Sequence, residues 1–242
     1  VIMAMGDDHT GESSTTLHQS DFAMVDAYMP IVSPAGVQEI LDYGLYAFAL
    51  SRYSGAWVGL KTMKDTVEVT SVVDGDPARM SFVTPDIPLP KDGLHIRLVD
   101  NPIAQEARLI DHKRPAAEAF ARANRIDHRV WGRPGARIGL VAAGKNWLDL
   151  VHALSLLGLD AAEAERLGIT TYKVGQVWPL DTVSFAEWAE GLDLIVVVEE
   201  KRKLIEGQIK EVLFASRKGQ RVYGWHKGDA QVDGKREVLF PI

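Results

Sequence analysis

The feature that most constrains the fold is the first twenty residues, where an unbroken apolar run meets a long polar segment. Residues 1–5 are all apolar, Gly6 follows them, and most of the next fourteen positions are polar. A short apolar run without alternation that ends at a glycine is typical of a strand buried on both faces of a parallel sheet. We therefore predict a strand over residues 1–5, followed by a loop at its carboxyl end.

A loop in that position is where open α/β sheets bind their ligands. Here it carries seven side chains that could take part in chemistry: Asp7, Asp8, His9, Glu12, Ser13, Ser14 and His18. The other interpretation is a solvated connection whose hydroxyl groups cap the next helix. The spacing alone leaves both interpretations open.

The start of the chain indicates a longer parent polypeptide. Chain termini usually lie at the surface, yet Val1 enters a predicted core strand directly, with no initiator Met and no leading polar tail. We expect these 242 residues to be one part of a larger protein.

Composition excludes several classes of site. The chain has no cysteine, which rules out disulfides, thiolate nucleophiles, cysteine-bound zinc and iron–sulfur clusters within it. A formal net charge of −6 gives no global reason to expect nucleic-acid binding. No window approaches a membrane-spanning apolar run, so no contact with a membrane is predicted. A cysteine-free chain is compatible with the cytoplasm, which is the location we expect.

The first part of the chain predicts strands and one helix in alternation. Ser33 and Pro34 suit the start of a helix, and Gly55 suits its end. Strands are expected over residues 28–32, 56–60 and 67–73, with a turn over residues 61–66. Strand, helix and strand in this order indicate a parallel sheet with crossover connections.

Proline and glycine then interrupt the pattern from Asp74 to Gly93, which predicts an irregular excursion. Asn101-Pro102 precedes a polar helical segment over residues 103–125. The turn at Arg133-Pro134-Gly135 is the predicted main boundary between domains.

The remainder predicts a second α/β unit, because apolar strand-length runs alternate with helical patterns. The expected strands are residues 137–143, 170–174, 194–198 and 221–225. The expected helices are residues 146–157, 161–167, 184–190 and 204–216.

Familiar motifs are weak in this chain. Gly6 and Gly11 have the spacing of a phosphate-binding loop, but Glu12 stands where the phosphate-binding lysine should be. At Gly144-Lys145-Asn146 the preceding residues form the strand itself, and Asn146 replaces the Mg²⁺-binding hydroxyl. We therefore reject both as nucleotide loops.

Other candidate sites have structural interpretations that we favour. A metal site built from Asp7, Asp8, His9 and Glu12 is chemically possible, but no standard ligand spacing supports it. Ser14 and His18 could be a nucleophile and its base, yet no G-x-S-x-G elbow surrounds the serine. Glu199 and Glu200 could supply a general base or a ligand for a cofactor amine. Acidic residues at the positive end of the following helix are the interpretation we prefer for them.

Several long segments together resemble one enzyme family. Residues 6–10 (GDDHT) and 33–40 (SPAGVQEI) resemble the pyrimidine-binding domain of the thiamine-diphosphate-dependent 2-oxoacid:ferredoxin oxidoreductases. They are most similar to the long, fused indolepyruvate ferredoxin oxidoreductases. Three later segments resemble the transketolase C-terminal-like domain of the same family: RIGLVAAGKNWLDL, TYKVGQVWPLD and LDLIVVVEEKRKLIEGQIKEVL. One departure is Gly11, because the family often has cysteine there, so any role of that thiol is lost.

The resemblance implies an α/β fold with two three-layer parallel-sheet units, the first truncated at its N-terminus and the second transketolase C-terminal-like. The implied domains are residues 1–74, the end of the pyrimidine-binding domain, and residues 135–242, the transketolase C-terminal-like domain. Residues 75–134 would be a linker that contains the polar helix.

The resemblance also implies a reaction and a site. The reaction is oxidative decarboxylation of a 2-oxoacid, indolepyruvate or another aryl or branched one, to an acyl-coenzyme A, with electrons passing to ferredoxin. A loop containing Asp7, Asp8, His9, Ser13 and Ser14 would form part of the wall of the cofactor cleft, and in the isolated chain this loop should be exposed and mobile. No catalytic residue and no metal ligand is expected on this chain.

The remaining parts of the machinery are expected on other segments of the full enzyme. The glutamate that activates the cofactor would precede Val1, a separate domain would hold the diphosphate and Mg²⁺, and cysteine-rich segments would hold the iron–sulfur clusters. We expect no cofactor on the isolated chain, which should be inactive. We expect a homodimer that forms through the sheet edge near residues 1–5 or the helix over residues 37–48.

Two other classes of function stay open at this point. One is a nucleotide-binding or regulatory α/β module, which a ligand at residues 144–146 would favour. The other is a non-catalytic structural or assembly domain. A first sheet without its opening strands would favour the oxidoreductase fragment over both.

Overall fold

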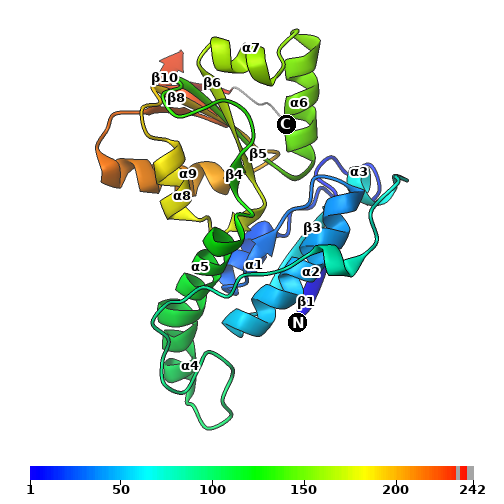
Figure 1. Ribbon diagram of the computed structural model, residues 1–242, viewed down its shortest axis with the longest axis vertical. Coiled ribbons are helices and arrows are strands. Elements are labelled where there is room, and N and C mark those ends of the chain that lie inside the picture. Colours follow the sequence, from blue (N-terminus) through cyan, green and yellow to red (C-terminus); the bar gives the residue numbers. More distant parts are fainter. Residues whose placement is uncertain (233–234, 239–242) are drawn as a thin grey trace. The chain divides into compact units, whose positions relative to one another are not determined.

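A computed structural model describes residues 1–232 and 235–238 of the chain (Figure 1). These residues form two compact units. The first contains residues Val1–Ile126 and Gln176–Asp181, and the second contains Asp127–Gly175 and Thr182–Ile242. The chain thus leaves the first unit at Ile126 and returns to it for six residues. Both units have mainly parallel sheets with flanking helices, so the predicted α/β class is confirmed.

The sheet of the first unit has the strand order β1-β3-β2-β7. Its strands are β1 (Ile2–Asp7), β3 (Val58–Met63), β2 (Ile31–Val32) and β7 (Gln176–Trp178). The first three are parallel, and β7 runs antiparallel to β2. The predicted crossover sheet is therefore confirmed, and an antiparallel strand from much later in the chain extends it.

Strand β1 differs from the prediction in its burial. Met5 and Asp7 are buried, whereas Ala4 and Gly6, which point to the other face, are exposed. The prediction of burial on both faces is therefore wrong. Within the described residues β1 also lies at the end of the sheet and pairs only with β3. One face of β1 is thus buried, and its outer edge has no partner strand among the described residues.

The helices of this region begin and end at recognisable signals. Helix α2 (Val37–Ser54) ends at Gly55, which adopts the left-handed conformation with φ 69°, as predicted. Its predicted start at Ser33-Pro34 is wrong, because the helix begins at Val37 with Gly36 as the N-cap residue. The Glu39 carboxylate accepts a hydrogen bond from the Ala35 backbone N–H at 2.8 Å, which holds the residues before the helix outside it. Two short helices, α1 (Asp21–Asp26) and α3 (Lys64–Val67), were not predicted.

The strand predicted over residues 67–73 does not form. Val67, Val69 and Val72 are 54%, 50% and 99% exposed, so they have no core to cover. β-Branched residues favour strands only where a pleated, half-buried surface receives them. Val67 is instead the last residue of helix α3, and residues 68–73 are irregular.

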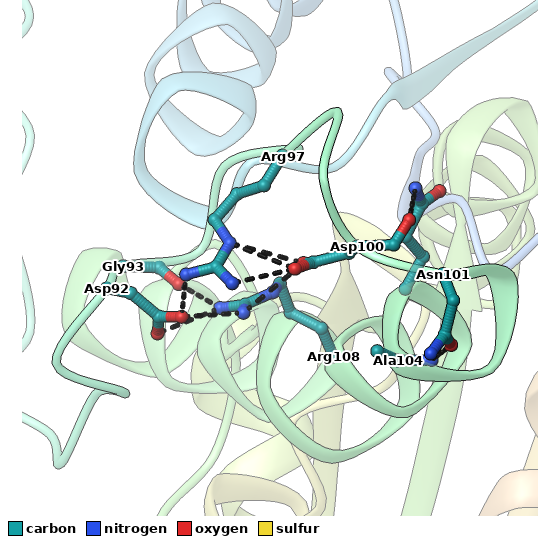
Figure 2. A network of polar contacts seen from close by, with 8 residues as sticks. Asp92, Gly93, Arg97, Asp100, Asn101, Ala104 and Arg108 are labelled. Carbon is teal, nitrogen blue, oxygen red and sulfur yellow. Dashed lines mark hydrogen bonds and ion pairs between the residues drawn. The ribbon is translucent and has the colours of Figure 1, made fainter.

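The irregular excursion and the polar helix after it are confirmed. The helical segment consists of α4 (Pro102–Arg108), a π-helical turn (Leu109–Lys113) and α5 (Arg114–Asn124). Figure 2 shows the ion pairs that stabilise the loop before it: Arg97 Nη2 lies 2.7 Å from Asp100 Oδ1, and Arg108 Nη2 lies 2.9 Å from Asp92 Oδ2. Asn101 caps α4 by accepting a hydrogen bond from the Ala104 N–H at 2.9 Å.

The core of the first unit joins the sheet to helices α2 and α5. Val32 and Val58 from the sheet pack with Tyr46 and Leu50 of α2 and with Phe120 of α5. Gln176 on β7 is fully buried and accepts a hydrogen bond from the Tyr46 hydroxyl at 3.1 Å. This polar contact attaches the returning segment to the core.

The second unit has the strand order β4-β6-β5-β8-β9. Its strands are β4 (His128–Arg129), β6 (Ile169–Val174), β5 (Ile138–Ala143), β8 (Leu194–Val198) and β9 (Arg221–Tyr223). Its helices are α6 (Gly144–Leu156), α7 (Ala161–Arg166), α8 (Thr182–Trp188) and α9 (Ile205–Ser216). Apart from β4, which is antiparallel to β6, neighbouring strands are parallel.

The predicted elements of the second unit are found with small shifts at their ends. An antiparallel pair, β10 (His226–Val232) and β11 (Lys235–Val238), follows β9 and was not predicted. Tyr172, Phe185 and Trp188 form a buried aromatic group in the core of this unit. In the part of the chain that the structure describes, no helix combines the length and apolar character needed to cross a bilayer.

Candidate functional site

The carboxyl ends of β1 and β3 bring a group of charged side chains together in the first unit. Asp7 is the last residue of β1, and Lys61 lies opposite Met5 in the parallel register with β3. Asp21 opens helix α1, which follows the loop after β1. Neighbouring parallel strands end at the same edge of a sheet, so the topology places these three residues where ligands usually bind.

Asp7 is the most heavily contacted carboxylate of this group. It is 2% exposed, and it accepts hydrogen bonds from the Ser20 backbone N–H at 3.0 Å and the Ser20 hydroxyl at 2.6 Å. Lys61 Nζ lies 3.8 Å and His9 Nε2 3.6 Å from Asp7 Oδ2. Burial alone would raise the pKa of Asp7, but the His9, Ser20 and Lys61 contacts outweigh it and hold that pKa well below its usual range.

Asp21 shares the lysine with Asp7. It is 1% exposed, and its Oδ2 lies 2.8 Å from Lys61 Nζ and 2.8 Å from Gln19 Nε2. Potential metal-ligand atoms of Asp7, His9 and Asp21 all lie within 4.8 Å of one another. The site is therefore a buried cluster of two carboxylates, an imidazole and an ammonium group.

Asp8 has a different role, because it organises the loop that follows the strand. Its carboxylate accepts hydrogen bonds from three backbone N–H groups, those of Glu12 at 3.0 Å, Ser13 at 2.7 Å and Ser14 at 2.6 Å. Desolvation opposes ionisation, yet these donors outweigh it and lower the pKa of Asp8 to about 2. Asp8 thus acts as an anionic cap for the polar loop.

The loop was predicted to be exposed, and this prediction is correct for its second half only. Ser13 and Ser14 are exposed. Asp7, Asp8 and His9 are 2%, 9% and 6% exposed, so the expectation that they face solvent is wrong. Each of these buried groups has partners within the unit, which explains why a polar segment can enter the interior.

The pairing of Ser14 with His18 does not form. The Ser14 hydroxyl donates to the Thr16 carbonyl at 2.7 Å, and His18 Nδ1 lies 3.2 Å from Asp7 Oδ1. Asp21 and Lys61 were absent from the predicted site. Lys61 was assigned to a turn, and only the β1–β3 register places it beside Asp7.

The contacts of Glu199 in the second unit agree with its interpretation as an acidic residue at the start of a helix. Its carboxylate accepts hydrogen bonds from the backbone N–H groups of Leu204, Ile205 and Glu206 at 3.0, 2.6 and 2.8 Å, at the start of helix α9. Burial raises the pKa of Glu199 to about 7, and these three N–H donors only partly oppose that effect. The residue caps a helix, as the preferred interpretation of the sequence proposed.

Comparison with known proteins shows which proteins the chain is similar to. Residues 128–242 match the family model described as the indolepyruvate oxidoreductase domain. The chain is 25% identical to indolepyruvate oxidoreductase subunit IorA of Pyrococcus abyssi over 87% of its own length, and 27% identical to IorA of Methanothermobacter marburgensis over 77%. It spans 32% and 28% of those relatives, or about a third of their length.

Solved structures agree on the fold. A 2-oxoglutarate:ferredoxin oxidoreductase from Magnetococcus marinus aligns with a TM-score of 0.56 and 14% identity, over 91% of this chain and 45% of that one. A split-gene transketolase aligns with a TM-score of 0.52 and 14% identity, over 95% of this chain and 58% of that one.

The family match thus lies in residues 128–242, just under half of the chain, and the likeness to IorA extends over most of its length. The chain therefore resembles a segment of IorA, and the solved structures support the same α/β fold.

The resemblance implies a thiamine cofactor, whose aminopyrimidine is activated by a carboxyl group that shares a proton with a ring nitrogen. Such a carboxyl group must be free of other partners. Asp7 is engaged by Ser20, and Asp8 by three backbone N–H groups of its own loop. Asp7 and Asp8 are therefore not free to supply the activating group.

Proposed function

We propose that this chain forms part of the cofactor-cleft wall of a 2-oxoacid:ferredoxin oxidoreductase, within a larger polypeptide or assembly. The collinear match to IorA relatives over most of the chain is the observation that carries the proposal. We further propose indolepyruvate, or another aryl or branched 2-oxoacid, as the substrate. The products would be an acyl-coenzyme A and reduced ferredoxin, and the reaction would take place in the cytoplasm.

In this proposal the chain's residues shape the cofactor cleft, and other segments of the enzyme perform the chemistry. Thiamine diphosphate supplies carbanion stabilisation when it is bound. The Asp8-capped loop would present Ser13 and Ser14 toward the cleft, and the buried Asp7 cluster would fix the base of that loop. The activating glutamate, the diphosphate and Mg²⁺ site and the iron–sulfur clusters would belong to other segments.

We also propose the domain assignment that the resemblance implies. Residues 1–74 would be the end of the pyrimidine-binding domain, residues 75–134 a linker with a helix, and residues 135–242 the transketolase C-terminal-like domain. A homodimer would form through the first domain, where β1 leaves an open sheet edge in the described structure.

The test uses a full-length relative of the IorA type with its partner subunits and this chain grafted at the matching positions. Indolepyruvate-dependent reduction of a low-potential dye, with coenzyme A present, should be retained, and the isolated chain should show none. A grafted enzyme that folds and binds thiamine diphosphate but oxidises no 2-oxoacid would refute the proposed function.

A second measurement addresses the isolated chain directly. Calorimetric titration with thiamine diphosphate and Mg²⁺ should show weak binding or none, because the chain lacks the proposed diphosphate site. Micromolar affinity would contradict the proposed division of labour between segments.

A further inference from the structure

We propose that Asp7, His9 and Asp21 bind a divalent first-row transition-metal ion at the carboxyl edge of the first unit's sheet. The three residues are 2%, 6% and 1% exposed, and one potential ligand atom from each lies within 4.8 Å of the others. Three ligands around one ion at metal–ligand distances of roughly 2.0–2.2 Å lie within that range of one another. This inference goes beyond the proposed oxidoreductase function and does not depend on thiamine.

A second observation indicates that a cation belongs here. Asp21 accepts hydrogen bonds at Oδ2 only, and its Oδ1 is buried with no hydrogen-bond partner among the described residues. A buried carboxylate oxygen without a partner is costly, and a coordinated cation or a bound water would satisfy it. Within the described cluster, Lys61 forms ion pairs with both buried carboxylates.

The donor set defines the class of ion. Two carboxylate oxygens and one imidazole nitrogen suit Zn²⁺, Fe²⁺, Co²⁺ or Mn²⁺, because imidazole favours borderline transition metals. Ca²⁺ and Mg²⁺ prefer a shell made of oxygen ligands, which this site does not provide. Asp8 is not proposed as a ligand, because the group of potential ligand atoms within 4.8 Å of one another consists of atoms from Asp7, His9 and Asp21.

The position of Lys61 predicts the direction in which metal affinity should change when this residue is replaced. Its Nζ lies 2.8 Å from Asp21 Oδ2 and 3.8 Å from Asp7 Oδ2, so the ammonium competes for the carboxylates that the metal would use. Removing that charge should therefore tighten metal binding. A site in which the lysine merely completes a structural ion pair would bind metal weakly with or without it.

The test is titration of the chelator-treated 242-residue chain with Co²⁺, followed through the visible d–d absorption and then by competition with Zn²⁺. We expect one ion to bind. His9→Gln and Asp21→Asn should each weaken binding by at least about tenfold, and Lys61→Met should strengthen it by about the same factor. Asp26→Asn, at the exposed end of the same helix α1, is the matched control and should leave affinity unchanged.

Each outcome decides the proposal. No Co²⁺ absorption at millimolar metal would overturn it, as would binding that His9→Gln and Asp21→Asn leave intact, since that would assign the ion to surface groups. Circular dichroism of every variant checks folding. If Asp21→Asn does not fold, His9→Gln and Lys61→Met decide, and a Lys61→Met variant that binds no better than the native chain refutes the competition.

Discussion

The hydrogen bond between Tyr46 and Gln176 should hold the returning segment, residues 176–181, to the first unit. The Tyr46 hydroxyl donates to Gln176 Oε1 at 3.1 Å, and Gln176 Nε2 donates to the Pro179 carbonyl at 2.8 Å and the Ala117 carbonyl at 3.4 Å. Tyr46 is 3% exposed and Gln176 is fully buried, so water cannot replace these partners without opening the core.

The expected losses of unfolding free energy follow from these contacts. Tyr46→Phe removes one neutral hydrogen bond, which should cost about 1 kcal/mol of unfolding free energy. Gln176→Leu removes these three bonds and leaves buried polar groups without that partner, so we expect a loss of roughly 3–5 kcal/mol. The double variant should lose about 1 kcal/mol less than the sum, because the shared bond is counted only once.

Native-state hydrogen exchange, measured by mass spectrometry on peptides from α2, reports the opening free energy of this unit. Tyr53→Phe is the matched control on the same helix, because its hydroxyl donates to the Pro85 carbonyl at 3.3 Å and not to Gln176. It should be additive with Gln176→Leu. If Tyr46→Phe is equally additive, the hydrogen bond does not couple β7 to α2 and the reasoning fails.

Three further predictions concern other parts of the chain. Gly139→Ala should destabilise the second unit by about 1–3 kcal/mol in urea unfolding, because the new Cβ would lie 2.5 Å from a Trp188 ring carbon and 2.7 Å from Leu192 Cδ1. Burial raises the pKa of Glu199 from 4.5 to about 7, so its contribution to stability is complete below pH 4.5 and is lost as the pH rises through about 7; the difference corresponds to about 3 kcal/mol. Unfolding measured across that range should show this decline in the native chain and not in Glu199→Gln, and parallel curves would contradict it. Asp8→Ala should increase proteolytic nicking of residues 10–17 while the exchange rates of β3 stay unchanged, and unchanged nicking would show that Asp8 does not order the loop.

The sequence by itself determined the elements whose signals are local. Gly55 ends α2 because a left-handed residue after the last turn suits glycine, and Asn101-Pro102 starts α4 because both residues suit a helix N-terminus. The apolar run at residues 194–198 predicts β8 because a central parallel strand is buried between its neighbours. The family resemblance rests on the same kind of contiguous segments.

Tertiary structure decided everything that depends on partners distant in sequence. The run at residues 67–73 has the composition of a strand, but no neighbouring strand receives it, so it stays irregular. β7 is only three residues long and lies in the sequence between elements of the second unit, yet it extends the sheet of the first unit through β2. Asp7 and Lys61 are 54 positions apart in the printed sequence, and only the parallel register of β1 and β3 makes them neighbours. Local propensity is fixed by adjacent residues, whereas the burial of a charge depends on which distant groups the fold brings to compensate it.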